Sequence, residues 1–173
     1  VALMRSATAF AAASHDICER VLAEFARSCS AVAAVTAAEG DAEIGADGGG
    51  SGSGHRSGGS SYSASMLRVH RYTTDADYPP HEDLGLLTLA PRSSLAGLLV
   101  QVPATGEWLA VEEGMAADEA LLFGGSTLAA RGGVAALPHK VRWRGATRLS
   151  APYFLRASPH VTLPASEATA VAA

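Results

Sequence analysis

Apolar positions recur along this chain with two different spacings, one in its first quarter and another after residue 65. Between residues 6 and about 38, they fall three and four residues apart at Ile17, Val21, Leu22, Phe25 and Cys29. Such spacings place side chains on one face of an α-helix. The pattern predicts a long N-terminal helix within residues 1–39, whose apolar stripe packs on a larger core.

A different pattern begins at residue 66. Short apolar runs alternate with turn residues, in the order MLRVHRY, LGLLTLA, GLLVQV, EWLAV, EALLFGG, STLAARG, HKVRW and RLSAPYFLR. None of these runs shows a sustained helical period. Many short strands separated by turn signals are typical of a β-sandwich or barrel. Residues 66–164 are therefore expected to form a mainly β domain, preceded by the long packing helix.

Two segments have a composition that does not favour a packed structure. Gly and Ser dominate residues 40–65. A segment of this kind buries too little apolar area to offset the entropy lost on ordering. It is expected to be a flexible insertion, and residues 165–173 are expected to be a disordered tail.

Composition narrows the class of protein. The chain has 173 residues, of which 48% are hydrophobic, and a net charge of −4. Its 13 basic residues are scattered, which argues against a nucleic-acid-binding surface. No apolar run approaches the roughly 18 residues of a membrane span. With only two cysteines, a reducing, cytoplasmic (intracellular) compartment is the expectation.

Two residues that are able to bind a metal precede the second apolar run. In an extended segment, side chains alternate in direction, so His81 and Asp83 point one way and Glu82 the other. A lone His-x-Asp is a weak signal, and a polar turn beside Pro79 and Pro80 is the alternative. A third candidate, His139, begins another strand-like run. Two His and one carboxylate on one face of a metal form the arrangement of non-haem Fe(II) oxygenases.

A second group of polar residues suits a carboxylate ligand. Arg148 and Ser150 share one face of a strand in the run RLS. The planar fork of an Arg grips a carboxylate in two places, and a neighbouring hydroxyl adds a donor. Tyr72 could give a phenolic hydrogen bond to the same group. The three residues could hold the far carboxylate of a dicarboxylic acid whose other end chelates the metal.

The motifs HEDLGLLTL, GLLVQ, GEWLAVE, ALLFGG, PHKV and RLSAPYFLR follow one another in a familiar order. Over about residues 66–164, they resemble the catalytic domain of the 2-oxoglutarate- and Fe(II)-dependent dioxygenases, and most of all the isopenicillin N synthase-like branch. The resemblance implies a double-stranded β-helix, or jelly roll. It also implies His81, Asp83 and His139 as iron ligands, and Arg148, Ser150 and Tyr72 as the residues that bind 2-oxoglutarate.

The activity implied is oxidation of a C–H bond of a small molecule, with consumption of O₂ and release of succinate and CO₂. Two departures stand out: His70 replaces a usual Asn, and FGGS at residues 123–126 replaces Asn-x-Gly-Asp. One alternative is a jelly-roll metal-binding or scaffold module that has lost turnover. Another is a cupin-type metal enzyme, against which the Arg-x-Ser pair argues. Neither a nucleic acid nor a membrane is expected as a partner.

Overall fold

The structure is a computed structural model, and it describes residues 2–28, 32, 64–73, 75–132 and 134–157. Helix α1 spans Ala2–Ser28, and a short 3₁₀ helix, η2, and a second α-helix, α3, lie in the later part of the chain. Within the described residues, the elements after α1 are β1 (Met66–Leu67), β2 (His70–Tyr72), β3 (Ala76–His81), β4 (Leu87–Pro91), β5 (Leu98–Gln101), β6 (Trp108–Ala110), η2 (Val111–Glu113), β7 (Ala120–Gly124), α3 (Ser126–Gly132), β8 (His139–Trp143), β9 (Arg148–Ser150) and β10 (Tyr153–Leu155).

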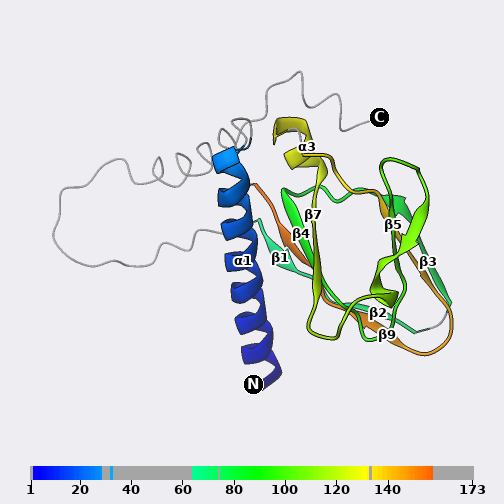
Figure 1. The fold of residues 1–173 in the computed structure, drawn as a ribbon. Coiled ribbons are helices and arrows are strands. Elements are labelled where there is room, and N and C mark those ends of the chain that lie inside the picture. Colours follow the sequence, from blue (N-terminus) through cyan, green and yellow to red (C-terminus); the bar gives the residue numbers. More distant parts are fainter. Residues whose placement is uncertain (1, 29–31, 33–63, 74, 133, 158–173) are drawn as a thin grey trace.

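The strands form two antiparallel sheets of four strands each. One sheet has the order β1-β10-β4-β7 and the other β3-β8-β5-β6, while β2 and β9 pair separately. The chain crosses between the sheets from β3 to β4, from β4 to β5, from β6 to β7 and from β7 to β8. This winding is the jelly roll, and it confirms the predicted mainly β fold. Helix α1 lies along the outside of the first sheet, where it contacts β10 and β4 (Figure 1).

The predicted N-terminal helix is present, but it begins earlier, and its buried face matches the predicted stripe only in part, at Leu22 and Val21. It starts at Ala2, so residues 2–5 are helical too. Its buried positions are Ser14, Cys18 and Leu22, whereas Ile17 and Phe25 of the predicted stripe remain 43% and 40% exposed. Ser and Cys are small, and they let the helix axis approach the sheet more closely than a stripe of large side chains would. Residues 33–39 lie outside the described part.

The strand predictions were largely right, with three corrections. The run STLAARG is not a strand, because residues 126–132 form α3. The first and last runs each contain two strands, β1 with β2 and β9 with β10. The segment that contains Pro79 and Pro80 is a strand, β3, which the apolar pattern missed. Proline lacks the N–H needed in a central strand, but β3 lies at the edge of its sheet.

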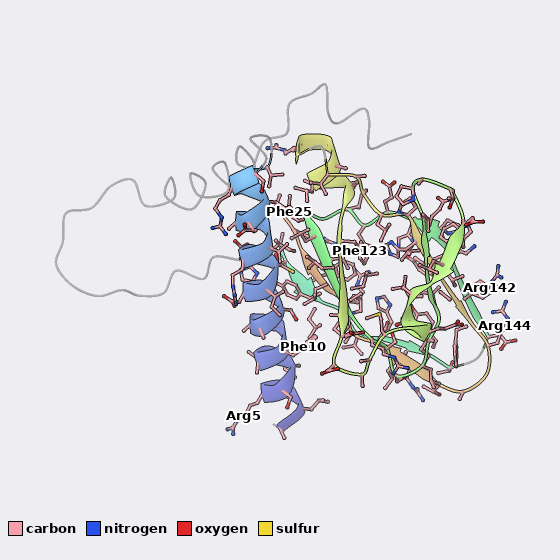
Figure 2. All side chains as sticks on the ribbon, viewed as in Figure 1. Arg5, Phe10, Phe25, Phe123, Arg142 and Arg144 are labelled. Atoms are coloured by element: carbon pink, nitrogen blue, oxygen red, sulfur yellow. The ribbon has the colours of Figure 1, made fainter. Side chains whose placement is uncertain are left out.

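Two apolar clusters lie on either side of the first sheet. The larger one joins Cys18 and Leu22 of α1 to Leu87, Leu128 and Leu155. The smaller one lies between the two sheets and contains Leu98, Val100 and Val141. Figure 2 shows Phe123 pointing into this space between the sheets. The small size of the inner cluster leaves room for a cavity there.

The Gly/Ser-rich segment at residues 40–65 lies outside the described residues, except for Ala64 and Ser65. The predicted tail at residues 165–173 also lies outside them. Among the described residues, no helix combines the length and the hydropathy that crossing a membrane requires.

Candidate metal centre and the cavity behind it

The structure brings His81, Asp83 and His139 together. One ligand atom from each lies within 4.8 Å of the others. Oδ1 of Asp83 is 3.8 Å from Nε2 of His81 and 3.8 Å from Nε2 of His139. The two imidazole rings lie with their centroids 4.3 Å apart. Two nitrogen donors and one oxygen donor therefore converge on one small volume.

The backbone brings the two histidines into register. β3 pairs with β8, and the pairing shifts by a bulge between Tyr78 and His81, which sets His81 opposite His139. A bulge re-aims the side chains that follow it, and bulges are common beside functional sites. The sequence alternation identified the shared face of His81 and Asp83, but the bulge was not predictable from it.

A close approach of two loops holds Asp83 in place. The backbone N–H of Ser126 donates to the carbonyl of Asp83 over 2.8 Å. A Cβ atom at Gly125 would lie 2.8 Å from that same carbonyl oxygen, so only glycine fits there. Gly125 of FGGS, a segment that departs from the Asn-x-Gly-Asp pattern, is thus required by the packing that positions the carboxylate.

Hydrogen bonds at the far side of each ring orient the histidines. Nδ1 of His139 lies 3.0 Å from the carbonyl oxygen of Leu137, and Nδ1 of His81 lies 2.9 Å from that of Pro79. A carbonyl oxygen only accepts, so each Nδ1 carries the proton and donates. In the neutral ring, Nε2 then has a free lone pair, which is the arrangement of a metal-bound histidine.

The carboxylate of Asp83 is oriented in the same way. Thr88 donates its hydroxyl to Oδ2 over 2.6 Å, which leaves Oδ1 facing the two histidines. The Asp83 side chain is only 10% exposed. Sequence reasoning missed Thr88, although its position as the polar residue inside the apolar run LGLLTLA was a signal.

Burial affects the charge of the cluster as well as its shape. The His139 side chain is 8% exposed, and burial lowers the pKa of His139, with the neighbouring His81 acting in the same direction. A lowered pKa favours the neutral ring at neutral pH, and the neutral ring is the form that binds metals. Imidazole nitrogens with a carboxylate oxygen suit Fe(II), among other divalent transition metals.

A cavity of about 260 Å³ adjoins this cluster. His81, Asp83 and His139 line it, together with Tyr72, Arg148 and Ser150, the residues predicted to bind a dicarboxylate. β2 pairs with β9 so that Tyr72 is opposite Arg148. The guanidinium carbon of Arg148 lies 5.0 Å from the centre of the Tyr72 ring. Both predicted groups of residues therefore share one cavity.

Arg148 already has a partner that the sequence did not reveal. Its Nη2 donates to both carboxylate oxygens of Glu112, at 3.2 and 3.0 Å, and to Oγ of Ser93 at 2.7 Å. Its Nε donates to the carbonyl of Leu95 over 2.9 Å. Both Arg148 and Glu112 are 2% exposed. The predicted carboxylate-binding arginine is thus half of a buried ion pair.

Backbone amides complete the environment of Glu112. The N–H groups of Ser93, Gly97 and Leu98 donate to its carboxylate at 3.0, 2.7 and 2.7 Å. Burial alone would raise the pKa of Glu112, but hydrogen bonds from Ser93 and Leu98 and the charge of Arg148 hold it below its usual range. Glu112 is therefore ionised at neutral pH, and it offsets the charge of Arg148.

One nitrogen of Arg148 remains unused. Nη1 is buried and has no hydrogen-bond partner among the described residues. Buried polar atoms are nearly always paired, so an unpaired one in a cavity wall indicates a missing ligand. Tyr72 and Ser150 line the same cavity as Arg148.

Comparisons with known proteins find similarity only among solved structures. No family model and no curated protein matches the chain. Solved structures with a similar fold include a putative oxygenase from Shewanella oneidensis (TM-score 0.48, 23% identity, covering 63% of this chain and 46% of that one). Another is the dioxygenase for auxin oxidation 1 from Arabidopsis thaliana with 2-oxoglutarate (TM-score 0.47, 22% identity, covering 60% of this chain and 42% of that one). A third is a putative 2OG-Fe(II) oxygenase family protein from Caulobacter crescentus (TM-score 0.43, 22% identity, covering 56% of this chain and 34% of that one).

The chain is less than 25% identical to each of the three structures, and the descriptions of two of them name 2-oxoglutarate or 2OG. It spans less than half the length of each of these three structures. Their descriptions do not name the isopenicillin N synthase-like branch, so that finer assignment stays a prediction.

Proposed function

We propose that the chain is the catalytic core of a non-haem Fe(II)- and 2-oxoglutarate-dependent oxygenase that oxidises a small molecule. One observation carries the proposal. His81, Asp83 and His139 converge beside the same cavity that is lined by Arg148, whose buried Nη1 is unpaired. A three-donor metal face and a carboxylate anchor in one cavity are what binding of a 2-oxo dicarboxylate to iron requires.

The proposed roles follow from the atoms that each residue leaves free. Nε2 of His81, Oδ1 of Asp83 and Nε2 of His139 would hold Fe(II) on one face and leave the opposite positions open. Arg148, Ser150 and Tyr72 would bind the distal carboxylate of 2-oxoglutarate. Bound iron and 2-oxoglutarate would supply the chemistry, in which O₂ oxidises a substrate C–H bond while 2-oxoglutarate becomes succinate and CO₂.

The chain's own contribution is orientation and exclusion of water. Leu137, Pro79 and Thr88 fix the three donor groups before any ligand arrives. Leu98 and Phe123 form part of the apolar wall of the cavity, and such a wall strengthens the electrostatic interactions inside it. Pockets for small molecules occupy roughly 300–1,000 Å³, so a cavity of about 260 Å³ fits a metabolite better than a polypeptide.

The buried Arg148–Glu112 pair favours a second candidate, a metal-binding jelly-roll module without turnover. Glu112 occupies Nη2 of Arg148, and a cosubstrate carboxylate would find only part of the guanidinium fork available. Release of succinate separates the two candidates, since an active oxygenase forms it from 2-oxoglutarate and a binding module does not.

The first test is an anaerobic titration of the full chain with Fe(II) and then 2-oxoglutarate. A weak visible charge-transfer band should appear when the keto acid chelates ferrous iron. Asp83→Asn should abolish the band, while Glu82→Gln should keep it, because Glu82 lies outside the ligand cluster. A folded wild-type chain that binds iron but gives no band would contradict the oxygenase proposal and favour the binding module.

A further inference from the structure

The mouth of the cavity has two arginines that the proposed chemistry does not use. Arg68, Phe154 and Arg156 all line the cavity. β1 pairs with β10 with Met66 opposite Phe154, and the N–H of Arg68 donates to the carbonyl of Pro152 over 3.0 Å. These residues therefore lie side by side on two neighbouring extended segments.

Strand alternation places them on the inner face of this sheet. Leu67, Tyr153 and Leu155, which alternate with them, pack in the cluster beside α1. Their neighbours Arg68, Phe154 and Arg156 consequently face the other way, toward the cavity. Arg68 is exposed and Arg156 is half-buried. The pair thus lies where the cavity meets solvent.

Neither arginine has an acidic partner in the described part of the chain. Three other arginines of the β domain do: Arg142 and Arg144 pair with Asp77, and Arg148 pairs with Glu112. The Arg68 guanidinium instead lies 5.7 Å from the centre of the Phe154 ring. An arginine stacked on an aromatic ring keeps its hydrogen-bond donors available at the ring's edge.

The charges along the cavity make its mouth attractive to anions. At the inner end, Arg148 and Glu112 cancel each other. At the mouth, Arg68 and Arg156 provide two positive charges and Glu82 provides one negative charge. Asp83 adds a second negative charge, at the metal end of the cavity. Positive charge at a concave opening raises the local concentration of anionic ligands.

We propose that the substrate of this site carries a carboxylate or phosphate next to a planar apolar body. Arg68 and Arg156 bind the anionic group, and the Phe154 ring packs against the body. The inference rests on the proposed function, because it names the substrate class of the same cavity. The proposal gives a role to Arg68 and Arg156, which take no part in the proposed binding of the metal or of 2-oxoglutarate.

The test uses phenylacetate as the probe, with phenylacetamide as its uncharged match and phenyl phosphate as the phosphate form. Binding to the full chain, without iron or 2-oxoglutarate, is followed by ¹H–¹⁵N NMR of the backbone and of the arginine Nε–H groups. Arg68→Gln and Arg156→Gln assign the two side-chain signals. Arg142→Gln is the control, because Arg142 lies at the outer edge of the β domain (Figure 2). In this variant Asp77 still has Arg144 as its ion-pair partner.

Phenylacetate should shift the Arg68 and Arg156 signals and bind at least tenfold more tightly than phenylacetamide. The double variant should lose roughly tenfold in affinity for the carboxylate, as expected for two charge-assisted hydrogen bonds at a solvated site. Its affinity for the amide should not change. Tighter binding of phenyl phosphate than of phenylacetate would identify phosphate as the preferred group.

Equal binding of phenylacetate and phenylacetamide would overturn the proposal. So would shifts confined to Arg148, because the probe would then occupy the inner end of the cavity. The probe needs no metal, so an absent ferrous 2-oxoglutarate band with intact probe binding would refute the oxygenase and leave the anion site standing. A normal band with no probe binding would refute the anion site alone.

Discussion

The two ends of the cavity handle charge in opposite ways. At the metal end, His81, Asp83 and His139 direct lone pairs at one point and are held there by Pro79, Leu137 and Thr88. At the inner end, Arg148 meets Glu112 in a buried pair with several backbone amides. The first end is arranged for a cation that the chain does not provide. The second end has its counter-ion built in.

This difference separates binding from stability. A cluster of two imidazoles beside one carboxylate contributes to function when a metal binds, whereas a buried ion pair affects folding directly if either partner is lost. Mutations at the metal end should therefore change ligand affinity. Mutations at the inner end should first change the free energy of unfolding.

The largest expected effect is on stability, from Glu112→Ala. It leaves the charge of Arg148 buried without a partner, which typically costs about 3–5 kcal/mol. Urea unfolding followed by circular dichroism measures it. Glu113→Ala, at the exposed neighbouring position, should change stability by less than about 0.5 kcal/mol. Equal effects of the two substitutions would show that the pair is not the stabilising feature.

The next effect is on metal affinity, from His139→Ala. Removal of one of three ligands should weaken Fe(II) binding by at least about 100-fold, since even residues that only orient a ligand contribute about 10–100-fold. Anaerobic competition with a chromogenic chelator measures the affinity. Lys140→Ala is the matched control, because Lys140 lies over the Trp108 ring. Retained affinity in the His139 variant would remove it from the proposed ligand set.

A smaller effect on metal affinity is expected from Thr88→Val. The substitution preserves shape but removes the hydrogen bond to Oδ2 of Asp83, and loss of such an orienting bond should weaken Fe(II) binding by about tenfold. Thr127→Val removes a hydroxyl bond to Leu84 in the same loop and should leave metal affinity within about twofold. If both variants lose affinity alike, loop stability rather than carboxylate orientation explains the loss.

The smallest effect is a pH dependence of stability. The pKa of Glu112 is below its usual value of 4.5 in the folded chain, so its contribution is complete above that value and is lost as pH falls through the lowered pKa. Wild-type stability should therefore fall with decreasing pH more steeply than that of Glu112→Gln, by at most about 1.4 kcal/mol per pH unit. Urea unfolding at several acidic pH values tests this, and parallel curves would contradict it.

The sequence predicted the metal end better than the inner end, for a physical reason. His81 and Asp83 share a face through strand alternation, which is a local property. The partners of Glu112 are far along the chain: Arg148 is 36 residues away, and the donating amides lie between residues 93 and 98. No local pattern reports such a convergence.

The errors in the fold have similar causes. α3 is too short, at residues 126–132, for a helical period to be distinguished from an apolar run. The buried face of α1 relies on Ser14 and Cys18, which a search for large apolar residues overlooks. β3 was missed because its prolines and polar residues do not look like a strand.

The prolines of β3 have a consequence for the whole molecule. An exposed edge strand offers free N–H groups to which a strand of another chain can bind, and this is a common route to aggregation. Pro79 and Pro80 have no N–H group, so this edge strand offers fewer donors directly before His81. The segment that delivers a proposed metal ligand thereby also protects its sheet from adding a foreign strand, so replacing these prolines would put solubility at risk as well as the geometry of the site.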